Sequence, residues 1–185
     1  MTAEAAPTTV ASSEERRANR RVAFTTALAG VVAVLCFVKF GFSGEAVVSA
    51  VFAATLVVLS ATDLERRIIP NKIVVPAAAF VLVAHIALHP GKTVEWTVAS
   101  FGAFLGFLAL ALVNPAGLGM GDVKLAFLLG AGLGWNVVAA LLFGTFAAGA
   151  YGVFLLATRG RSGLKTSFPL GPFLAAAALV VLFLS

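Results

Sequence analysis

Charged residues are scarce in this chain, which has 185 residues of which 11% are charged. Soluble domains normally carry about 25% charged residues, so this composition excludes an ordinary water-soluble domain. Cysteine is scarcer still, because Cys36 is the only one and lies inside an apolar run. A single cysteine excludes an intramolecular disulfide and a cysteine-rich zinc site. The hydrophobic content of 61% and the mean hydropathy of +1.04 predict a membrane-embedded protein.

Acidic residues are fewer than basic ones, which gives a net charge of +5 and an isoelectric point near 10.0. A basic balance can indicate nucleic-acid binding. Here, however, the positive charges lie in short clusters between apolar runs, as the positive-inside rule expects of membrane proteins. We therefore predict membrane lipid as a partner and no nucleic acid.

Seven apolar runs follow a polar N-terminal segment, residues 1–21, which we expect to be a disordered cytoplasmic tail. A membrane-spanning helix needs roughly 17–25 residues, and most runs reach that length with a flanking residue or two. No run shows the in–out alternation of a membrane barrel. The predicted fold is an all-α polytopic transmembrane helix bundle of about seven spans, with residues 22–185 as one domain. The runs are Val22–Val38, Ala46–Ala61, Ile73–Leu88, Val94–Val113, Val123–Leu133, Val137–Ala157 and Phe168–Leu184.

One run, Val123–Leu133, is too short to cross a bilayer alone. It is expected to begin inside the protein or to be part of a broken helix, which is allowed where the backbone is shielded from lipid. If Val123–Ala157 is instead one long or re-entrant unit, the number of spans is six.

The positive charges predict the orientation of the bundle. With a cytoplasmic N-terminus and seven alternating spans, eleven of the thirteen Lys and Arg residues lie on the cytoplasmic side. Only Lys39 and Lys92 lie outside. This asymmetry is the one that the positive-inside rule predicts for an inner (cytoplasmic) membrane protein.

Only two aspartates occur in the chain, and both lie where an apolar run meets a polar segment. Asp63 follows the run Ala46–Ala61, and Asp122 closes the segment Gly119–Asp122. In the predicted topology both are at the cytoplasmic face. A carboxylate at the edge of a bilayer is costly to keep and is a functional candidate by default. Taken singly, each has a simpler interpretation, as a helix cap or as a juxtamembrane loop residue.

Two neighbouring carboxyl groups can hydrolyse a peptide bond if one is ionised and the other neutral, because such a pair shares a proton. The ionised member takes a proton from water, and the neutral member protonates or polarises the carbonyl. Gly119 and Gly121 permit positive φ and a close approach of backbone, and Asp122 is predicted to be a helix N-cap. We therefore predict that Asp63 and Asp122 form a catalytic pair that needs no metal and no cofactor.

Three segments resemble the motifs of the type IV prepilin peptidases, in the same order. The segment Thr62–Asn71 resembles the first aspartate motif, in which basic residues and an Ile-Pro-Asn turn follow the aspartate. The segment Gly117–Leu125 is similar to the G-x-G-D-x-K-L signature, and Pro169–Ala175 resembles a late Gly-Pro-Phe motif.

The resemblance implies an aspartic endopeptidase that cuts a short basic leader from a prepilin or pseudopilin at the cytoplasmic face. Larger members of that family carry a cytoplasmic domain with zinc-binding cysteines and also methylate the new N-terminus. No loop here could hold such a domain, so we expect a peptidase only, like the small members that serve tight-adherence pili. Asp63 and Asp122 would be catalytic; the predicted substrate-binding surroundings are Gly119, Gly121, Lys124, Pro70, Asn71, Gly171 and Pro172.

Individual roles follow for some of these residues. Asn71 is expected to cap the third helix after the turn at Pro70, and Gly171 and Pro172 to begin a helix that walls the cleft. Lys124 would contact a lipid phosphate, a substrate carbonyl or Asp63, or would only anchor the topology.

The two histidines, His85 and His89, have a spacing that can bind metal, but they lie toward the outer face and no metal site is predicted. Trp96 and Trp135 are expected at the outer membrane interface.

Three rival interpretations stay open at this stage. A presenilin-type intramembrane protease shares G-x-G-D, but its Tyr-Asp and Pro-Ala-Leu motifs do not occur in this sequence. A proton-coupled transporter would use the aspartates as proton carriers, although internal repeats and midplane charges are expected of that class. A third interpretation is a pilus-assembly scaffold without catalytic activity. In that case Asp63→Asn and Asp122→Asn would each leave leader processing unchanged.

Overall fold

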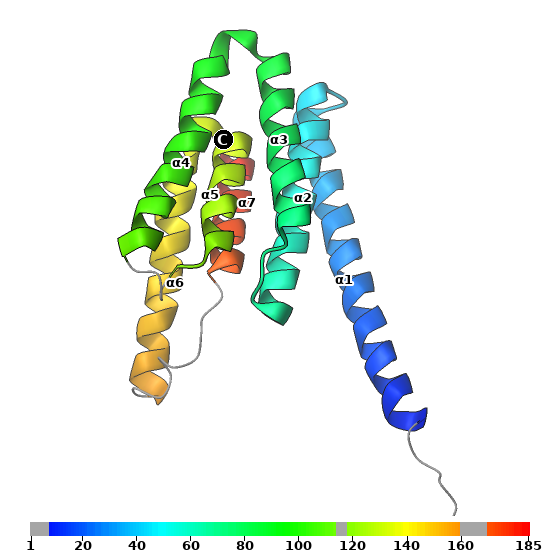
Figure 1. The fold of residues 1–185 in the computed structure, drawn as a ribbon. Coiled ribbons are helices and arrows are strands. Elements are labelled where there is room, and N and C mark those ends of the chain that lie inside the picture. Colours follow the sequence, from blue (N-terminus) through cyan, green and yellow to red (C-terminus); the bar gives the residue numbers. More distant parts are fainter. Residues whose placement is uncertain (1–7, 114–117, 160–169) are drawn as a thin grey trace, which may run out of the picture.

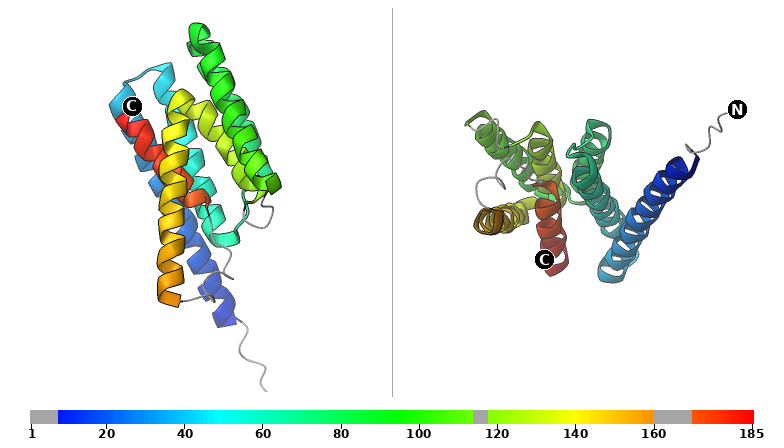
Figure 2. Two further views of the ribbon diagram at one scale, coloured as in Figure 1. Left: turned by 90° about the vertical axis from the view of Figure 1, so that its left-hand side faces the viewer. Right: turned by 90° about the horizontal axis from the view of Figure 1, so that it is seen from below.

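A computed structural model describes residues 8–113, 118–159 and 170–185 of the chain, and these contain seven α-helices and no strand (Figure 1). The helices run in alternating directions as an antiparallel bundle (Figures 1 and 2). Their bounds are α1 Thr8–Phe40, α2 Gly44–Arg66, α3 Asn71–Leu88, α4 Thr93–Val113, α5 Met120–Leu133, α6 Val137–Arg159 and α7 Gly171–Leu184, with 3-10 turns η1 Pro90–Lys92 and η2 Gly134–Asn136. The predicted all-α fold is confirmed.

Five helical segments are long and apolar enough to cross a membrane, so the chain is an integral membrane protein. The fifth segment, Met120–Thr158, contains α5, η2 and all of α6 except its last residue. With 14 residues each, α5 and α7 are about 21 Å long at 1.5 Å per residue, against roughly 30 Å of hydrocarbon. The predicted seven crossings and the cytoplasmic N-terminus stay predictions.

Two helices extend beyond the apolar runs that predict them. α1 begins at Thr8, so residues 8–21 of the expected tail are helical in the structure, in keeping with their content of Ala, Glu and Arg, which favour helix. The division of the chain at residue 22 stays a prediction. α2 continues to Arg66, five residues past the end of its apolar run, so Asp63 lies in the last turn of the helix.

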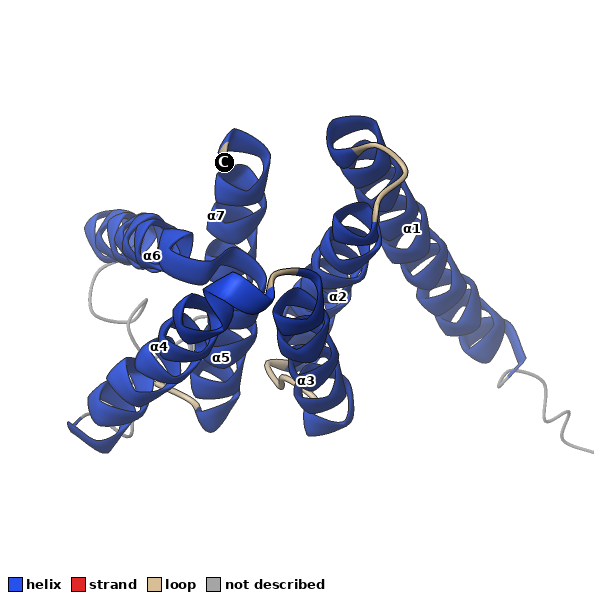
Figure 3. Ribbon diagram, turned by 90° about the horizontal axis from the view of Figure 1, so that it is seen from above, coloured by secondary structure: helices blue, strands red, loops and turns tan. Residues whose placement is uncertain are grey.

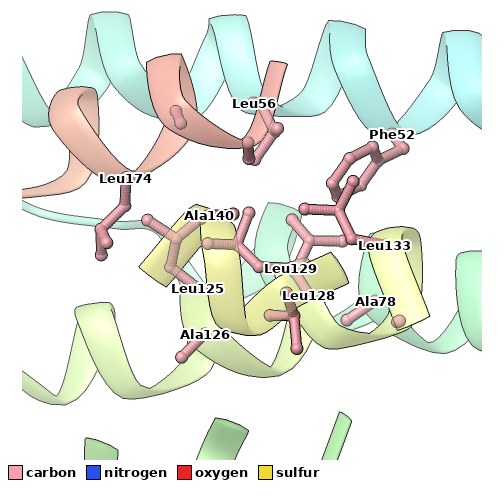
Figure 4. Close-up of a cluster of buried hydrophobic side chains, with 14 of the residues drawn as sticks. Phe52, Leu56, Ala78, Leu125, Ala126, Leu128, Leu129, Leu133, Ala140 and Leu174 are labelled. Carbon is pink, nitrogen blue, oxygen red and sulfur yellow. The ribbon is translucent and has the colours of Figure 1, made fainter. Parts of the chain in front are cut away.

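The core surrounds α5, which lies in the middle of the bundle and packs against the helices on every side (Figure 3). Its side chains from Val123 to Leu133 are almost all buried. Figure 4 shows the side chains that meet there: Phe52, Leu56, Ala78, Leu125, Ala126, Leu128, Leu129, Leu133, Ala140 and Leu174. The helix with the short apolar run is therefore the central one, and Asp122 lies in its first turn.

Glycine allows the helices to approach closely around α5. A methyl group on Gly130 would meet the backbone of Ala99 and Ser100 on α4, and one on Gly144 would lie 2.9 Å from the Cα of Leu174 on α7. Small residues at helix contacts are the usual device of membrane proteins, because association there depends on close packing.

Candidate active site

Asp63 is fixed by contacts at both its backbone and its side chain. Its side chain is buried, and its Oδ2 accepts a hydrogen bond from the backbone N–H of Gly171, at 3.1 Å. Its carbonyl oxygen accepts the N–H of Arg67, at 2.8 Å, and Arg67 ends α2 in the left-handed conformation with φ 54°. The carboxyl group is therefore set by the end of α2 and by the first residue of α7.

Gly171 lies so close to Asp63 that no side chain fits. A Cβ at this position would lie 2.6 Å from Asp63 Oδ2 and 3.2 Å from its Cγ. Pro172 follows in the first turn of α7, where proline costs no helical hydrogen bond. The two residues begin a helix as predicted, although the predicted start at Phe168 lies outside the described residues.

Asp122 lies in the first turn of α5, at the same end of the bundle as Asp63 and Gly171 (Figure 1). The charge of Asp63 acts electrostatically on Asp122. The N-cap of α5 is Gly119, and Asp122 is three residues further on, so the prediction of Asp122 as the N-cap was wrong. Its Oδ2 accepts the N–H of Gly119, at 3.3 Å, as an acidic residue at this third position commonly does.

Neither Gly119 nor Gly121 adopts an unusual backbone conformation, and only Gly121 is closely packed. Gly119 has φ −78°, and Gly121 is not among the residues with positive φ, so that part of the prediction was wrong. The predicted close approach does occur: a Cβ on Gly121 would lie 3.0 Å from the Cβ of Ile69. Ile69 is buried in the turn between α2 and α3. We predicted no role for Ile69, and its apolar side chain within the polar segment that follows Asp63 is the signal that could have pointed to it.

A second contact joins the same two segments. Nζ of Lys124 donates a hydrogen bond to Oδ1 of Asn71, at 2.7 Å. Asn71 was predicted to cap α3, and this prediction was wrong. Pro70 occupies the N-cap position, and Asn71 is the first helical residue. Its side chain is therefore free to accept from α5. Each of the three motif segments thus contacts another, and the aspartates belong to one connected site.

The histidines lie at the opposite end of the bundle. His85 shares a hydrogen bond of 2.8 Å between its Nδ1 and the carbonyl of Ala131, and its ring stacks on Trp96. Nε2 of His89 lies 2.7 Å from Oε1 of Glu45. Trp96 is half-buried against His85 at this end of the bundle, and its place at the outer membrane interface stays a prediction. Within the described ranges, no group of three or more His, Cys, Asp or Glu side chains is placed to hold a metal ion.

Comparison with known proteins adds a family relationship to this geometry. The type IV leader peptidase family matches residues 50–156 of the chain. A prepilin leader peptidase/N-methyltransferase of Bacillus subtilis is 31% identical over 168 residues, covering 86% of this chain and 66% of that protein. A protein of the same name from Burkholderia pseudomallei is 33% identical over 163 residues, covering 83% and 52%. Leader peptidase HopD of Escherichia coli is 34% identical over 140 residues, covering 70% and 88%.

The chain thus spans about half to two thirds of the length of the N-methyltransferase relatives. No solved structure matches the chain.

Proposed function

Because the chain belongs to the type IV leader peptidase family, we propose that it is an aspartic endopeptidase that removes the basic leader of a prepilin or pseudopilin. The active site would face the cytoplasm from the inner membrane, on the side where charge counting puts eleven of the thirteen basic residues. The proposal needs no metal and no organic cofactor, because two carboxyl groups and a water supply the chemistry.

The arrangement of the carboxyl oxygens is the observation that carries this proposal. Oδ2 of Asp63 is held by the N–H of Gly171, and Oδ2 of Asp122 by the N–H of Gly119. Among the described residues, no hydrogen bond is made to either Oδ1. Each carboxyl is therefore oriented through one oxygen and has the other available for water or substrate.

The proposed reaction uses these two oxygens in turn. The ionised carboxyl accepts a proton from water while the water oxygen attacks the scissile carbonyl carbon, and the neutral carboxyl donates its proton to the carbonyl oxygen. The tetrahedral intermediate then collapses. The C–N bond breaks as the departing amine takes the proton from one carboxyl. A hydroxyl of the intermediate gives its proton to the other carboxyl as it becomes a carbonyl, which returns the pair to its single shared proton.

The residues around the pair would hold the substrate strand or shape its path. Gly119 leaves space beside the carboxyl of Asp122, whereas Gly171 and Gly121 allow Asp63 and Ile69 to approach. Pro70 and Asn71 set the turn into α3, Pro172 begins α7, and Lys124 is free to exchange Asn71 for a substrate carbonyl.

To test this proposal, a candidate prepilin is co-expressed with the wild type or with Asp63→Asn or Asp122→Asn. Leader removal is measured as the decrease in prepilin size. Each substitution keeps the side-chain volume but removes the proton chemistry, so we expect the rate to fall by about 10²- to 10⁴-fold. Glu95→Gln, an equivalent change at the opposite end, should leave processing unchanged. If both Asn variants process the leader at the wild-type rate, the aspartic mechanism is wrong and the scaffold interpretation gains support.

A further inference from the structure

A small polar cavity lies at the end of the bundle opposite the aspartates, where α3 turns into α4 (Figure 1). We call it the histidine cavity. Its volume is about 180 Å³, which is the liquid volume of roughly six water molecules. Segments far apart in sequence form it, and the proposed reaction uses none of them. Most of its lining is polar: Glu45, Ser49, His85, His89, Lys92 and Asn136.

His85 is held in a way that leaves one of its ring nitrogens unused. The residue is 5% exposed, its ring stacks on Trp96 with centroids 4.1 Å apart, and its Nδ1 lies 2.8 Å from the carbonyl oxygen of Ala131. Because a carbonyl can only accept, Nδ1 carries the hydrogen, and Nε2 of the neutral ring keeps its lone pair. No described residue donates to Nε2. His85 therefore offers the cavity a buried acceptor in a fixed position.

Two more acceptors lie on α2, about one turn apart. Ser49 is also 5% exposed, and its Oγ makes no hydrogen bond within the described part of the chain. Oε1 of Glu45 lies 2.7 Å from Nε2 of His89, and its Oε2 has no partner among the residues that the structure describes. Buried polar groups are nearly always paired in native proteins. Two unpaired and almost fully buried polar side chains, those of His85 and Ser49, therefore indicate a site for a polar ligand.

The formal charges around the cavity cancel when the histidines are neutral. Glu45 and Lys92 line it. Just outside the lining, Nζ of Lys39 donates to the carbonyl of Leu182, at 2.9 Å, and Oε1 of Glu95 lies beside η2. Two cations thus stand against two anions, so the cavity favours neither a bare cation nor a bare anion. A ligand that carries both charges can pair with Glu45 and with Lys92.

A primary ammonium matches the acceptors of the histidine cavity. It has three N–H donors, and the acceptors are Nε2 of His85, Oγ of Ser49 and the free carboxylate oxygen of Glu45. A quaternary ammonium has no N–H and cannot make these bonds. Lys92 and Asn136 are exposed donors at the same cavity and suit a neighbouring anionic group. The cavity lies at helix ends, which in a membrane protein are within reach of lipid headgroups.

We propose that the histidine cavity binds a small zwitterion that carries a primary ammonium, either the headgroup of phosphatidylethanolamine or a free molecule of the same chemistry, such as phosphoethanolamine. The ammonium would join α2 to α3 through Glu45, Ser49 and His85, so binding should stabilise the fold. The inference is independent of the proposed function, because the cavity lies at the other end of the bundle.

Trp96 supplies the signal for the test. It lines the cavity, whereas Trp135, the other tryptophan of the chain, is 56% exposed and lies outside the lining. In the Trp135→Phe protein, the tryptophan emission therefore comes from the cavity alone. Phosphatidylethanolamine is titrated into phosphatidylcholine nanodiscs that hold the full chain, and we expect a saturable change in this emission. Phosphatidylglycerol, which has the anion but no ammonium, should give no saturable change, and an equal response to it would overturn the proposal.

Substitutions of the acceptors assign the change to the cavity. Ser49→Ala removes one hydrogen bond and should raise the half-saturating lipid fraction about two- to tenfold, and Glu45→Gln, which removes a charge, should raise it about tenfold. Glu95→Gln is the matched control, because it makes the same charge change at the same end but outside the lining. It should titrate as the parent protein does. If Ser49→Ala and Glu45→Gln also titrate like the parent, the cavity is not the binding site.

A second titration, with soluble phosphoethanolamine in phosphatidylcholine nanodiscs, separates the two sources of the ligand. A response to the lipid alone identifies the headgroup, and a response to the soluble molecule identifies a free zwitterion; no response to either refutes the inference. Thermal unfolding gives an independent readout. At tenfold the half-saturating ligand, the unfolding midpoint should rise by about 2–4 °C, and by less in Glu45→Gln. An unchanged midpoint in the parent protein counts against binding.

Discussion

Gly171 lies against Asp63, so Gly171→Ala, which replaces one hydrogen by a methyl group, tests how the site holds this aspartate. In Gly171→Ala the new Cβ would lie 2.6 Å from Asp63 Oδ2, 3.2 Å from Cγ and 3.4 Å from Cβ. Rotating the carboxyl group about the Cβ–Cγ bond moves Oδ2 but leaves Cγ at 3.2 Å, so rotation alone cannot relieve the contact. Either Asp63 or the start of α7 must move, although the N–H donor itself is retained.

The size of the displacement sets the expected loss of activity. Real Cβ atoms essentially never approach another heavy atom within 3.0 Å, so Asp63 Oδ2 and the methyl group must separate by at least about 0.4 Å. Catalytic groups have to be held within about 0.5 Å of their working geometry, and a misplacement of about 1 Å can cost about 100-fold in rate. Alanine before Pro172 also disfavours a helical backbone. We therefore expect kcat to fall about 10- to 100-fold, which is about 1.4–2.7 kcal/mol in the activation barrier.

The assay is the initial rate of leader removal from purified prepilin in nanodiscs, with the thermal unfolding midpoint of each variant measured alongside. Gly152→Ala is the matched control, because a Cβ on this α6 residue meets nothing within 4 Å. It should keep the wild-type rate. A folded Gly171→Ala protein with unchanged kcat would show that the start of α7 does not set the working position of Asp63.

Three further substitutions test other contacts. Gly130→Ala drives a methyl group into the backbone of α4 and should lower the free energy of unfolding by about 1–3 kcal/mol, whereas Gly102→Ala, which meets nothing within 4 Å, should not lower it in thermal unfolding. A double-mutant cycle of Lys124→Met and Asn71→Ala should give a coupling energy of about 0.5–1.5 kcal/mol; additive effects would contradict their hydrogen bond. Arg67→Gly should stabilise the fold by about 1 kcal/mol, since φ 54° is costly for arginine, and a lower unfolding midpoint would argue against that conformation.

The sequence was sufficient to predict the helical class, the lengths of most helices and the placement of both aspartates at one end. These features depend on local signals, namely apolar run length and the distribution of positive charge. The end of α2 was predicted too early, because a hydropathy pattern ends at the first charged residue. The helix itself continues until Arg67 adopts the left-handed conformation.

The contacts within the site could not be predicted, because each joins segments distant in sequence. Gly171 and Asp63 are 108 residues apart, and Lys124 and Asn71 are 53 apart. Nothing local marks Ile69 as the neighbour of Gly121. Glycine in a motif has several physical explanations. The sequence suggested both positive φ and close approach, and the structure shows close approach at Gly121 and neither feature at Gly119.

The two carboxyls are held alike, but only one of the two positions that hold them requires glycine. Each Oδ2 is bound by a backbone N–H, from Gly171 in one case and from Gly119 in the other. A backbone donor is kept by every substitution except proline, so a side-chain change at these positions acts by displacing the donor and not by removing it. At Gly171 the displacement is forced by a Cβ at 2.6 Å, whereas at Gly119 the nearest contact would be 3.6 Å, with Oδ2 of Asp122. Substitution by alanine should therefore impair the side of the site that holds Asp63 far more than the side that holds Asp122.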